Sequence, residues 1–270
     1  MNAKALVLAA LLAILPATAD AKTLCTLIMN PADGRIAVEQ GDCRTRVTPA
    51  STFKLALAVM GYDAGILIDM QSPLLDIRAG DPDWGGAEWK RPATPARWMR
   101  HSIVWYSQRI AEELGAERLT DYARRFGYGN ADFSGDPGED NGLQRAWIAS
   151  SLAISPAEQA AFLSAFVNRT LPVAPAVFGQ VEAIVETNTI DDGWTVSGKT
   201  GSAYPRKADG SFDRNRGYGW YVGWAEKGER RAVFARLIQD EKREKVSGGL
   251  RTRAALFEDL PALLNNAGVQ

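Results

Sequence analysis

The chain has 270 residues, 46% hydrophobic and 23% charged, a composition typical of a soluble globular protein. Its 31 lysines and arginines nearly balance its 32 acidic residues, so it lacks the cationic surplus that binding to nucleic acid or an anionic membrane requires. Two cysteines are too few for a zinc ribbon or an iron–sulfur centre, and one histidine excludes multi-histidine metal sites. We therefore expect no metal, and any imidazole base would have to be His101.

The N-terminus has the pattern of a secretory signal peptide over residues 1–21. Lys4 gives a positive start, residues 5–15 form an apolar run, and Pro16 precedes two A-x-A sites that would cleave after Ala19 or Ala21. The alternative is a transmembrane anchor, but the apolar run is shorter than the roughly 20 residues that a spanning helix needs. We expect export to the bacterial periplasm, no membrane span after cleavage, and one domain over residues 22–270.

The two cysteines flank a predicted β-hairpin. Residues 23–29 and 35–41 alternate in polarity on either side of a turn signal at residues 30–34. Folding about this turn brings Cys25 close to Cys43, and export permits a disulfide between them. The alternative is a pair of free, buried thiols.

The first half of the chain after the hairpin is predicted to be mainly helical. Apolar spacing predicts a helix from residue 51 that ends at Gly65. Residues 70–100 are rich in Pro, Gly and Trp and indicate surface loop with short helical turns. Residues 102–129 indicate two helices broken at Gly115, and residues 128–147 indicate a further loop.

The second half changes from helical to strand periodicity. A capping box at Ser155 and Glu158 begins a helix, and another is expected over about 175–187. Strands are predicted over residues 193–204, 217–226 and 230–240, followed by an amphipathic helix over 248–266 whose apolar face would hold Leu250, Ala254, Phe257, Leu260 and Leu264.

This order predicts an α/β (α+β) fold. Strands joined by short turns are antiparallel, so the strands at both chain ends should form one central antiparallel sheet flanked by helices. Residues from roughly 56 to 180 should form a second, mainly helical lobe. Clefts between such lobes are favoured positions for binding sites.

Ser51-Thr52-Phe53-Lys54 is the only S-x-x-K in the chain. At the start of a helix, positions i and i+3 lie on one face, so the amine of Lys54 can reach the hydroxyl of Ser51. Burial would lower the pKa of the lysine and allow its neutral form to act as a base, while the helix N-terminus offers N–H groups to an oxyanion. The alternative is a helix cap followed by a solvated lysine.

Three other short motifs could contribute to a site. Lys199, within Ser197-Gly198-Lys199-Thr200-Gly201, could hold an anion, or could simply protect an edge strand. Ser102, in Ser102-Ile103-Val104, could relay a proton, or could be an N-cap. Tyr128-Gly129-Asn130 would, taken alone, be interpreted as a turn.

In this order and spacing, the four motifs resemble the class D serine β-lactamases, the oxacillinase type. The resemblance extends from Lys22 to the C-terminal helix and includes Pro49 and Ala50 before Ser51, the stretch 220–224, and Gly249-Leu250-Arg251. The related class A enzymes have S-D-N where this chain has Ser102-Ile103-Val104. The family has the serine β-lactamase/transpeptidase-like fold.

The resemblance implies a nucleophile and a modified base. Ser51 would be acylated, and Lys54 would carry CO₂ as N6-carboxylysine and serve as general base. No cofactor is implied beyond the CO₂ or bicarbonate that this modification needs. Trp147 matches the family's tryptophan that hydrogen-bonds this group, since an indole N–H is a donor only. Val104, with Phe53 and Ile148, would line the apolar pocket around the lysine.

The resemblance also implies how substrate would be held. Ser102, helped by Lys199, would pass a proton to the β-lactam nitrogen. Substrate binding would involve Lys199, Thr200, Gly201, Ser202 and Arg251: the carboxylate on Lys199, Thr200 and Arg251, and the oxyanion on the backbone N–H groups of Ser51 and Ser202.

The implied activity is hydrolysis of penicillin-type antibiotics, with a small-molecule β-lactam as partner and antibiotic resistance as the result. The alternative is a β-lactam sensor or penicillin-binding protein that acylates without turnover. Nothing assigns His101 a catalytic role, and the sequence contains no signal for oligomeric state.

Overall fold

The computed structural model describes residues 21–266. The expected signal peptide, residues 1–21, lies outside the described residues except for Ala21. Within residues 21–266, no helix is both long and apolar enough to cross a membrane.

Six strands form one antiparallel sheet in the described part of the chain, with spatial order β2-β1-β6-β5-β4-β3. The strands are β1 (Lys22–Met29), β2 (Ile36–Gly41), β3 (Glu186–Thr189), β4 (Thr195–Ala203), β5 (Tyr218–Lys227) and β6 (Arg230–Gln239). Because β1 pairs with β6, the two chain ends share the sheet, as the sequence predicts. The expected α/β (α+β) class and central antiparallel sheet are confirmed.

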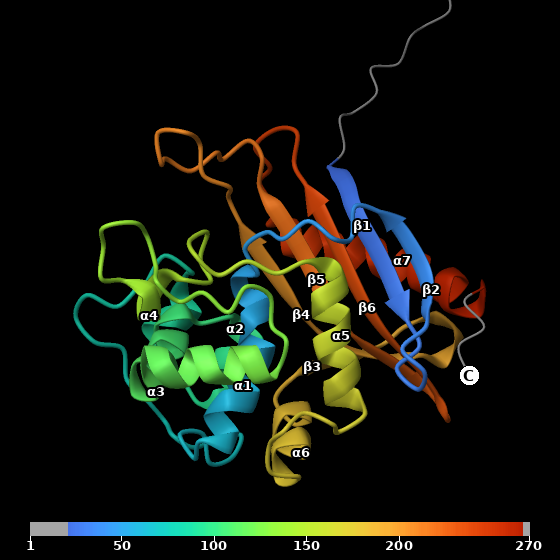
Figure 1. Ribbon diagram of the computed structural model, residues 1–270, viewed down its shortest axis with the longest axis horizontal. Coiled ribbons are helices and arrows are strands. Elements are labelled where there is room, and N and C mark those ends of the chain that lie inside the picture. Colours follow the sequence, from blue (N-terminus) through green and yellow to red (C-terminus); the bar gives the residue numbers. More distant parts are fainter. Residues whose placement is uncertain (1–20, 267–270) are drawn as a thin grey trace, which may run out of the picture.

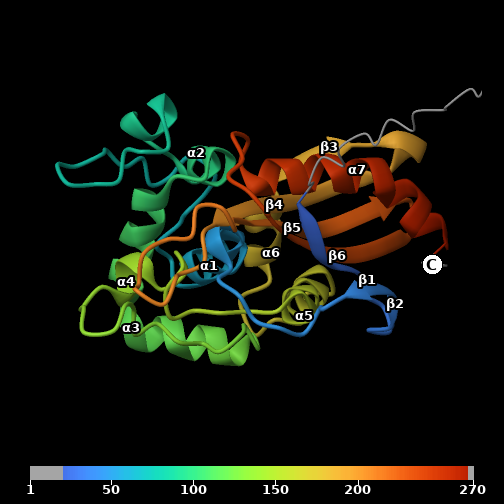
Figure 2. The same ribbon diagram turned by 90° about the horizontal axis from the view of Figure 1, so that it is seen from above.

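Helices cover both faces of this sheet and form a group at its side (Figure 1). The α-helices are α1 (Phe53–Asp63), α2 (Pro95–His101), α3 (Val104–Arg125), α4 (Gly142–Arg145), α5 (Pro156–Val167), α6 (Ala176–Glu182) and α7 (Gly248–Asn266), with short 3₁₀ helices η1 (Ala50–Thr52), η2 (Ala87–Lys90) and η3 (Asp191–Gly193). Seen from above, α7 lies on one face and α5 on the other (Figure 2). The helices α1 to α4 lie beside the sheet, so the chain between β2 and α5 makes a mainly helical region.

Helix α1 lies at the centre of the molecule. All of its residues except Asp63 are buried, and it packs against α3 and α6. A helix that is apolar on every side needs such an enclosed position. The short helix η1 precedes it directly and contacts β4 and β5, so the start of α1 lies where the helices meet the sheet.

Several local signals act as the sequence predicts. The capping box of α5 is present, with Ser155 and Glu158 bonding each other's backbone N–H groups. Gly115 interrupts α3 with φ 76°, and the hairpin of β1 and β2 places Cys25 opposite Gly41. The expected disulfide between Cys25 and Cys43 is confirmed.

Two expectations are wrong. The helix expected over about 175–187 ends at Glu182, and residues 186–189 form strand β3, a short polar edge strand that alternation of apolar residues could not reveal. The apolar face of α7 is also shifted, because Leu250 is 46% exposed and Ala254 is exposed, while Leu256 is buried with Leu260 and Leu264.

Candidate active site

Ser51 and Lys54 meet at the junction of η1 and α1. The Lys54 Nζ lies 3.4 Å from the Ser51 Oγ, within hydrogen-bond distance. Ser51 is partly exposed, whereas Lys54 is only 1% exposed. Ala50, just before the serine, has φ 51°, a left-handed conformation that costs energy for a residue with a Cβ. The site therefore presents a reachable hydroxyl with a buried amine beneath it.

The surroundings of Lys54 favour its neutral form. Burial, and next the charge of Lys199, lower the pKa of Lys54 well below its ordinary value. Phe53, beside it in the chain, is fully buried, and its ring lies 5.4 to 5.7 Å from those of Trp147, Tyr128 and Phe133. Burial removes the water that would solvate an ammonium group, so the neutral amine of Lys54 is favoured. The alternative of a solvated lysine is wrong.

Trp147 adds an unused donor to this region. Its side chain is 1% exposed, and within the described residues its indole Nε1 has no hydrogen-bond partner. A buried N–H without an acceptor costs about 1–3 kcal/mol, so such groups call for an explanation.

The backbone near Trp147 is tied to the segment before Ser51. The Thr48 Oγ1 donates to the Trp147 carbonyl and accepts from the Ala149 N–H, both at 2.9 Å. The Trp220 indole donates to the Thr48 carbonyl at 2.9 Å. Thr48 therefore connects the tryptophan segment, the sheet and the approach to the serine, a role that no motif indicated.

Ser102 lies between α2 and α3 in a left-handed conformation, with φ 57° and ψ 36°. Ile103, rather than Ser102, is the N-cap of α3, so the N-cap interpretation of Ser102 is wrong. Its Oγ is buried and has no partner among the described residues. The neighbouring His101 carbonyl accepts from the Trp89 indole at 2.9 Å, which anchors this turn.

Lys199 is a buried cation in the middle of β4. It is 6% exposed, and its Nζ donates to the Thr200 carbonyl at 3.1 Å. Burial lowers the pKa of Lys199 to about 8, while Glu186 raises it and Arg253 lowers it. Strand β3 pairs only with residues 195–198, so the edge beyond them is not covered by β3. Because Lys199 is buried, it does not protect this edge as an exposed lysine would.

The end of β4 is packed closely between η1 and α7. A Cβ on Gly201 would lie 2.9 Å from the Pro49 carbonyl oxygen, so this position needs glycine. On the other side, the Gly249 N–H donates to the Ser202 Oγ at 2.8 Å. Ser202 is exposed and Thr200 is half-buried, so both lie at the surface beside the serine-bearing η1.

Arg251 lies in the first turn of α7, next to this strand end. Its Nη2 donates to the Asp240 Oδ1 at 2.5 Å and its Nε donates to the Val246 carbonyl at 3.1 Å. Two of its nitrogens are thus used within the protein. A bidentate contact of Arg251 with a substrate carboxylate would have to displace or share one of them.

The motif Tyr128-Gly129-Asn130 contributes to the packing around η1. The Tyr128 hydroxyl contacts the Gln159 side chain at 3.5 Å, which donates to the Thr52 Oγ1 at 2.7 Å. Gly129 has φ 59°, and a Cβ there would collide with the Ala153 carbonyl. The turn interpretation therefore holds for the backbone, while Tyr128 and Gln159 together brace η1.

The remaining predicted residue, Val104, is 4% exposed and begins α3, directly after Ile103. Within the described residues there is no group of three or more His, Cys, Asp or Glu side chains that could hold a metal ion.

Comparison with known proteins places this arrangement among proteins that react with β-lactams. The family model described as the penicillin binding protein transpeptidase domain matches residues 20–262. The chain is 41% identical over 254 residues to β-lactamase OXA-9 of Klebsiella pneumoniae, covering 93% of this chain and 92% of that protein. It is 34% identical over 213 residues to β-lactamase OXA-1 of Escherichia coli, covering 78% and 73%.

A solved structure gives the same result. The crystal structure of the OXA-427 class D β-lactamase superposes with a TM-score of 0.84 at 46% identity, covering 90% of this chain and 99% of that one.

Proposed function

The chain belongs to the class D serine β-lactamases and is a β-lactam hydrolase, and we propose that it opens penicillin-type antibiotics through an acyl-enzyme on Ser51. The observation that carries this proposal is the pairing of Ser51 with a buried Lys54 at 3.4 Å. Trp147, whose indole N–H has no partner among the described residues, packs its ring against that of Phe53, the residue before Lys54. A serine is a weak nucleophile unless a base takes its proton, and no other base contacts it among the described residues.

The reaction has two halves. In acylation, the Ser51 Oγ loses its proton and bonds to the β-lactam carbonyl carbon; the ring C–N bond breaks and the nitrogen takes a proton. In deacylation, water loses a proton and bonds to the same carbon, the ester bond breaks, and Ser51 regains its proton. The penicilloic acid product thus contains one added water.

Lys54 is the residue that we propose carries CO₂. Only a neutral amine reacts with CO₂, forming an N–C bond and releasing one proton, and burial favours that neutral form. The product is anionic and needs donors, and the free indole N–H of Trp147 is a donor that fits this need. When bound, the carboxyl group supplies a general base for Ser51 and for the hydrolytic water.

Ser102 and the β4 edge would handle the rest of the substrate. The buried, unpartnered Ser102 hydroxyl suits a proton relay to the β-lactam nitrogen. Lys199, whose pKa of about 8 leaves it mostly cationic at pH 7, would hold the substrate carboxylate with Thr200 and Arg251. The backbone N–H groups of Ser51 and Ser202 would bind the oxyanion.

We also propose that residues 1–21 direct export to the periplasm, where the activity would confer antibiotic resistance. The disulfide between Cys25 and Cys43 supports this location, because such bonds persist in oxidising compartments.

Rapid-mixing kinetics with a chromogenic cephalosporin test the proposal. We expect a burst followed by sustained turnover, and no burst with Ser51→Ala. A wild-type protein that releases one equivalent of chromophore and then stops would instead be a sensor or penicillin-binding protein.

A further inference from the structure

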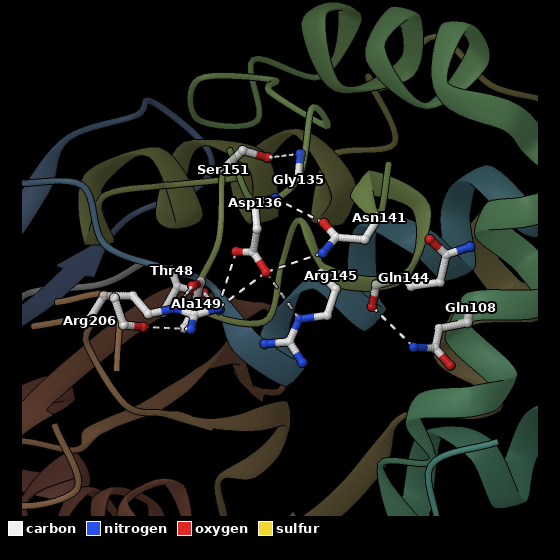
Figure 3. A network of polar contacts seen from close by, with 11 residues as sticks. Thr48, Gln108, Gly135, Asp136, Asn141, Gln144, Arg145, Ala149, Ser151 and Arg206 are labelled. Atoms are coloured by element: carbon white, nitrogen blue, oxygen red, sulfur yellow. Dashed lines mark hydrogen bonds and ion pairs between the residues drawn. The ribbon is translucent and has the colours of Figure 1, made fainter. Parts of the chain in front are cut away.

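Arg206, in the loop between β4 and β5, joins two loops that are far apart in the sequence (Figure 3). Its Nε donates to the Ala149 carbonyl at 3.1 Å, and its Nη2 contacts both carboxylate oxygens of Asp136, at 3.1 and 3.2 Å. Its Nη1 donates to the Gly210 carbonyl at 2.8 Å, and its guanidinium lies 4.1 Å from the centre of the Phe212 ring. The guanidinium of Arg206 is therefore held by Gly210 and Phe212 of its own loop while it binds Asp136 and Ala149.

Asp136 is in turn fixed in the loop between α3 and α4. Its backbone N–H donates to the Asn141 Oδ1 at 2.9 Å, and the Asn141 Nδ2 donates back to its carboxylate at 3.2 Å. Arg145 lies 3.6 Å from the same carboxylate. Burial opposes ionisation, but the hydrogen bond from Asn141 and the charges of Arg206 and Arg145 hold the pKa of Asp136 below its ordinary value.

The contact with Ala149 leads to the catalytic region. Ala149 has φ 52°, a left-handed conformation that an alanine keeps only when its surroundings impose it. Its N–H is held by the Thr48 Oγ1, which also holds the Trp147 carbonyl, and its own carbonyl is held by Arg206. Trp147 lies two residues before this clamped position; its ring lies 5.4 Å from that of Phe53, the residue before Lys54, and its indole N–H has no partner among the described residues.

We propose that Arg206 and Asp136 form a brace that positions Trp147 toward the carboxylated Lys54. The loop between β4 and β5 thereby sets how firmly the lysine retains CO₂. The inference rests on the proposed carboxylation of Lys54. Arg206 and Asp136 are positioning residues, since they act through Ala149 and Trp147 and bond to neither Ser51 nor Lys54 in the structure.

The exposure of the brace makes this role separable from folding. The side chains of Arg206 and Asp136 are 33% and 24% exposed, and ion pairs near the surface contribute little to overall stability. Removing Arg206 should therefore release Ala149 and Trp147 locally and leave the fold intact. Unfolding curves check that the variant remains folded.

The test measures carboxylation directly, by ¹³C NMR of the protein titrated with ¹³C-bicarbonate. We expect Arg206→Ala to raise the bicarbonate concentration for half-maximal carbamate signal by about fivefold, a coupling of the size seen between packed neighbours. Asp136→Asn should act in the same direction with a smaller shift. Arg206→Lys keeps a charge for Asp136 but cannot span both partners, so its shift should lie between wild type and Arg206→Ala.

Arg214→Ala is the matched control, because Arg214 is an exposed arginine of the same loop that lies over the Tyr204 ring at 5.9 Å. We expect it to titrate like wild type. For Arg206→Ala, kcat should recover at saturating bicarbonate.

Two results would overturn the account at different levels. An unchanged half-saturation in Arg206→Ala, alongside a shifted one in Trp147→Phe, would refute the brace and leave the proposed function intact. The absence of any carbamate signal in the wild-type protein would refute the modified base itself.

Discussion

Replacing Trp147 with phenylalanine tests the proposed partner of the modified lysine most closely. The change keeps an aromatic ring against Phe53 and deletes one N–H that has no acceptor in the described residues. A hydrogen bond to a charged group contributes about 1.5–3 kcal/mol. Since 1.4 kcal/mol is a factor of ten, Lys54 should retain CO₂ about 10- to 150-fold less tightly.

The same change should barely alter the unmodified protein. The smaller ring removes packing in a fully buried position, at a cost of about 1–3 kcal/mol. Deleting a buried donor without a partner returns about 1–3 kcal/mol. These two effects oppose each other, so the free energy of unfolding without bicarbonate should stay close to that of wild type.

Bicarbonate then separates the two proteins. A bound group at 100 times its dissociation constant stabilises the folded state by about 2.7 kcal/mol, and at one times that constant by about 0.4 kcal/mol. If Trp147→Phe raises the dissociation constant for CO₂ a hundredfold, the stabilisation by bicarbonate therefore falls from about 2.7 to about 0.4 kcal/mol. Urea unfolding with and without bicarbonate measures both.

Trp98→Phe provides the control for losing a buried indole. Trp98 is fully buried, but its Nε1 donates to the Ser107 Oγ at 2.8 Å. This variant should lose stability in both conditions and keep the full gain from bicarbonate. If Trp147→Phe also kept the full gain, the indole would not be the partner of the modified lysine.

Three further predictions concern the rest of the molecule. Replacing Cys25 and Cys43 with serine removes a disulfide between residues 18 positions apart in the sequence, and should lower the free energy of unfolding by about 3 kcal/mol. Calorimetry that finds no decrease in Tm would contradict this. The value of kcat/KM should fall at acid pH as Lys54, whose pKa is lowered by burial, protonates and releases CO₂. It should also fall above about pH 8 as Lys199 loses its charge. An alkaline decrease that persists in Lys199→Ala would have another source. His101→Asn should keep kcat within about twofold, because the His101 Nε2 faces the Glu88 carboxylate at 3.6 Å and it is the backbone carbonyl of His101 that accepts from Trp89. A folded but inactive variant would restore imidazole as a candidate base.

Sequence reasoning succeeds where local spacing determines the contact. The S-x-x-K spacing brings Lys54 to Ser51 because i and i+3 share a helix face. The hairpin register brings Cys25 to Cys43 because a short turn leaves few ways to pair the strands. The central strands β4, β5 and β6 are likewise evident from their apolar runs.

Sequence reasoning fails where the contact joins distant segments without a pattern. Strand β3 has four polar residues and exists because β4 offers it a partner. Gln159 lies 107 positions from Thr52, and Arg206 lies 70 positions from Asp136. No periodicity relates these pairs. The missing partner of Trp147 also becomes visible only when all of its neighbours are known.

The central claim is that Ser51 is acylated and that Lys54 is needed to release the acyl group. Intact-mass spectrometry of the Lys54→Ala variant mixed with benzylpenicillin tests it most directly. We predict a lasting mass increase of one substrate, located on the peptide containing Ser51 and absent from Ser51→Ala, while wild type returns to its unmodified mass once substrate is consumed. A Lys54→Ala variant that turns over substrate at the wild-type rate and retains no adduct would contradict the account.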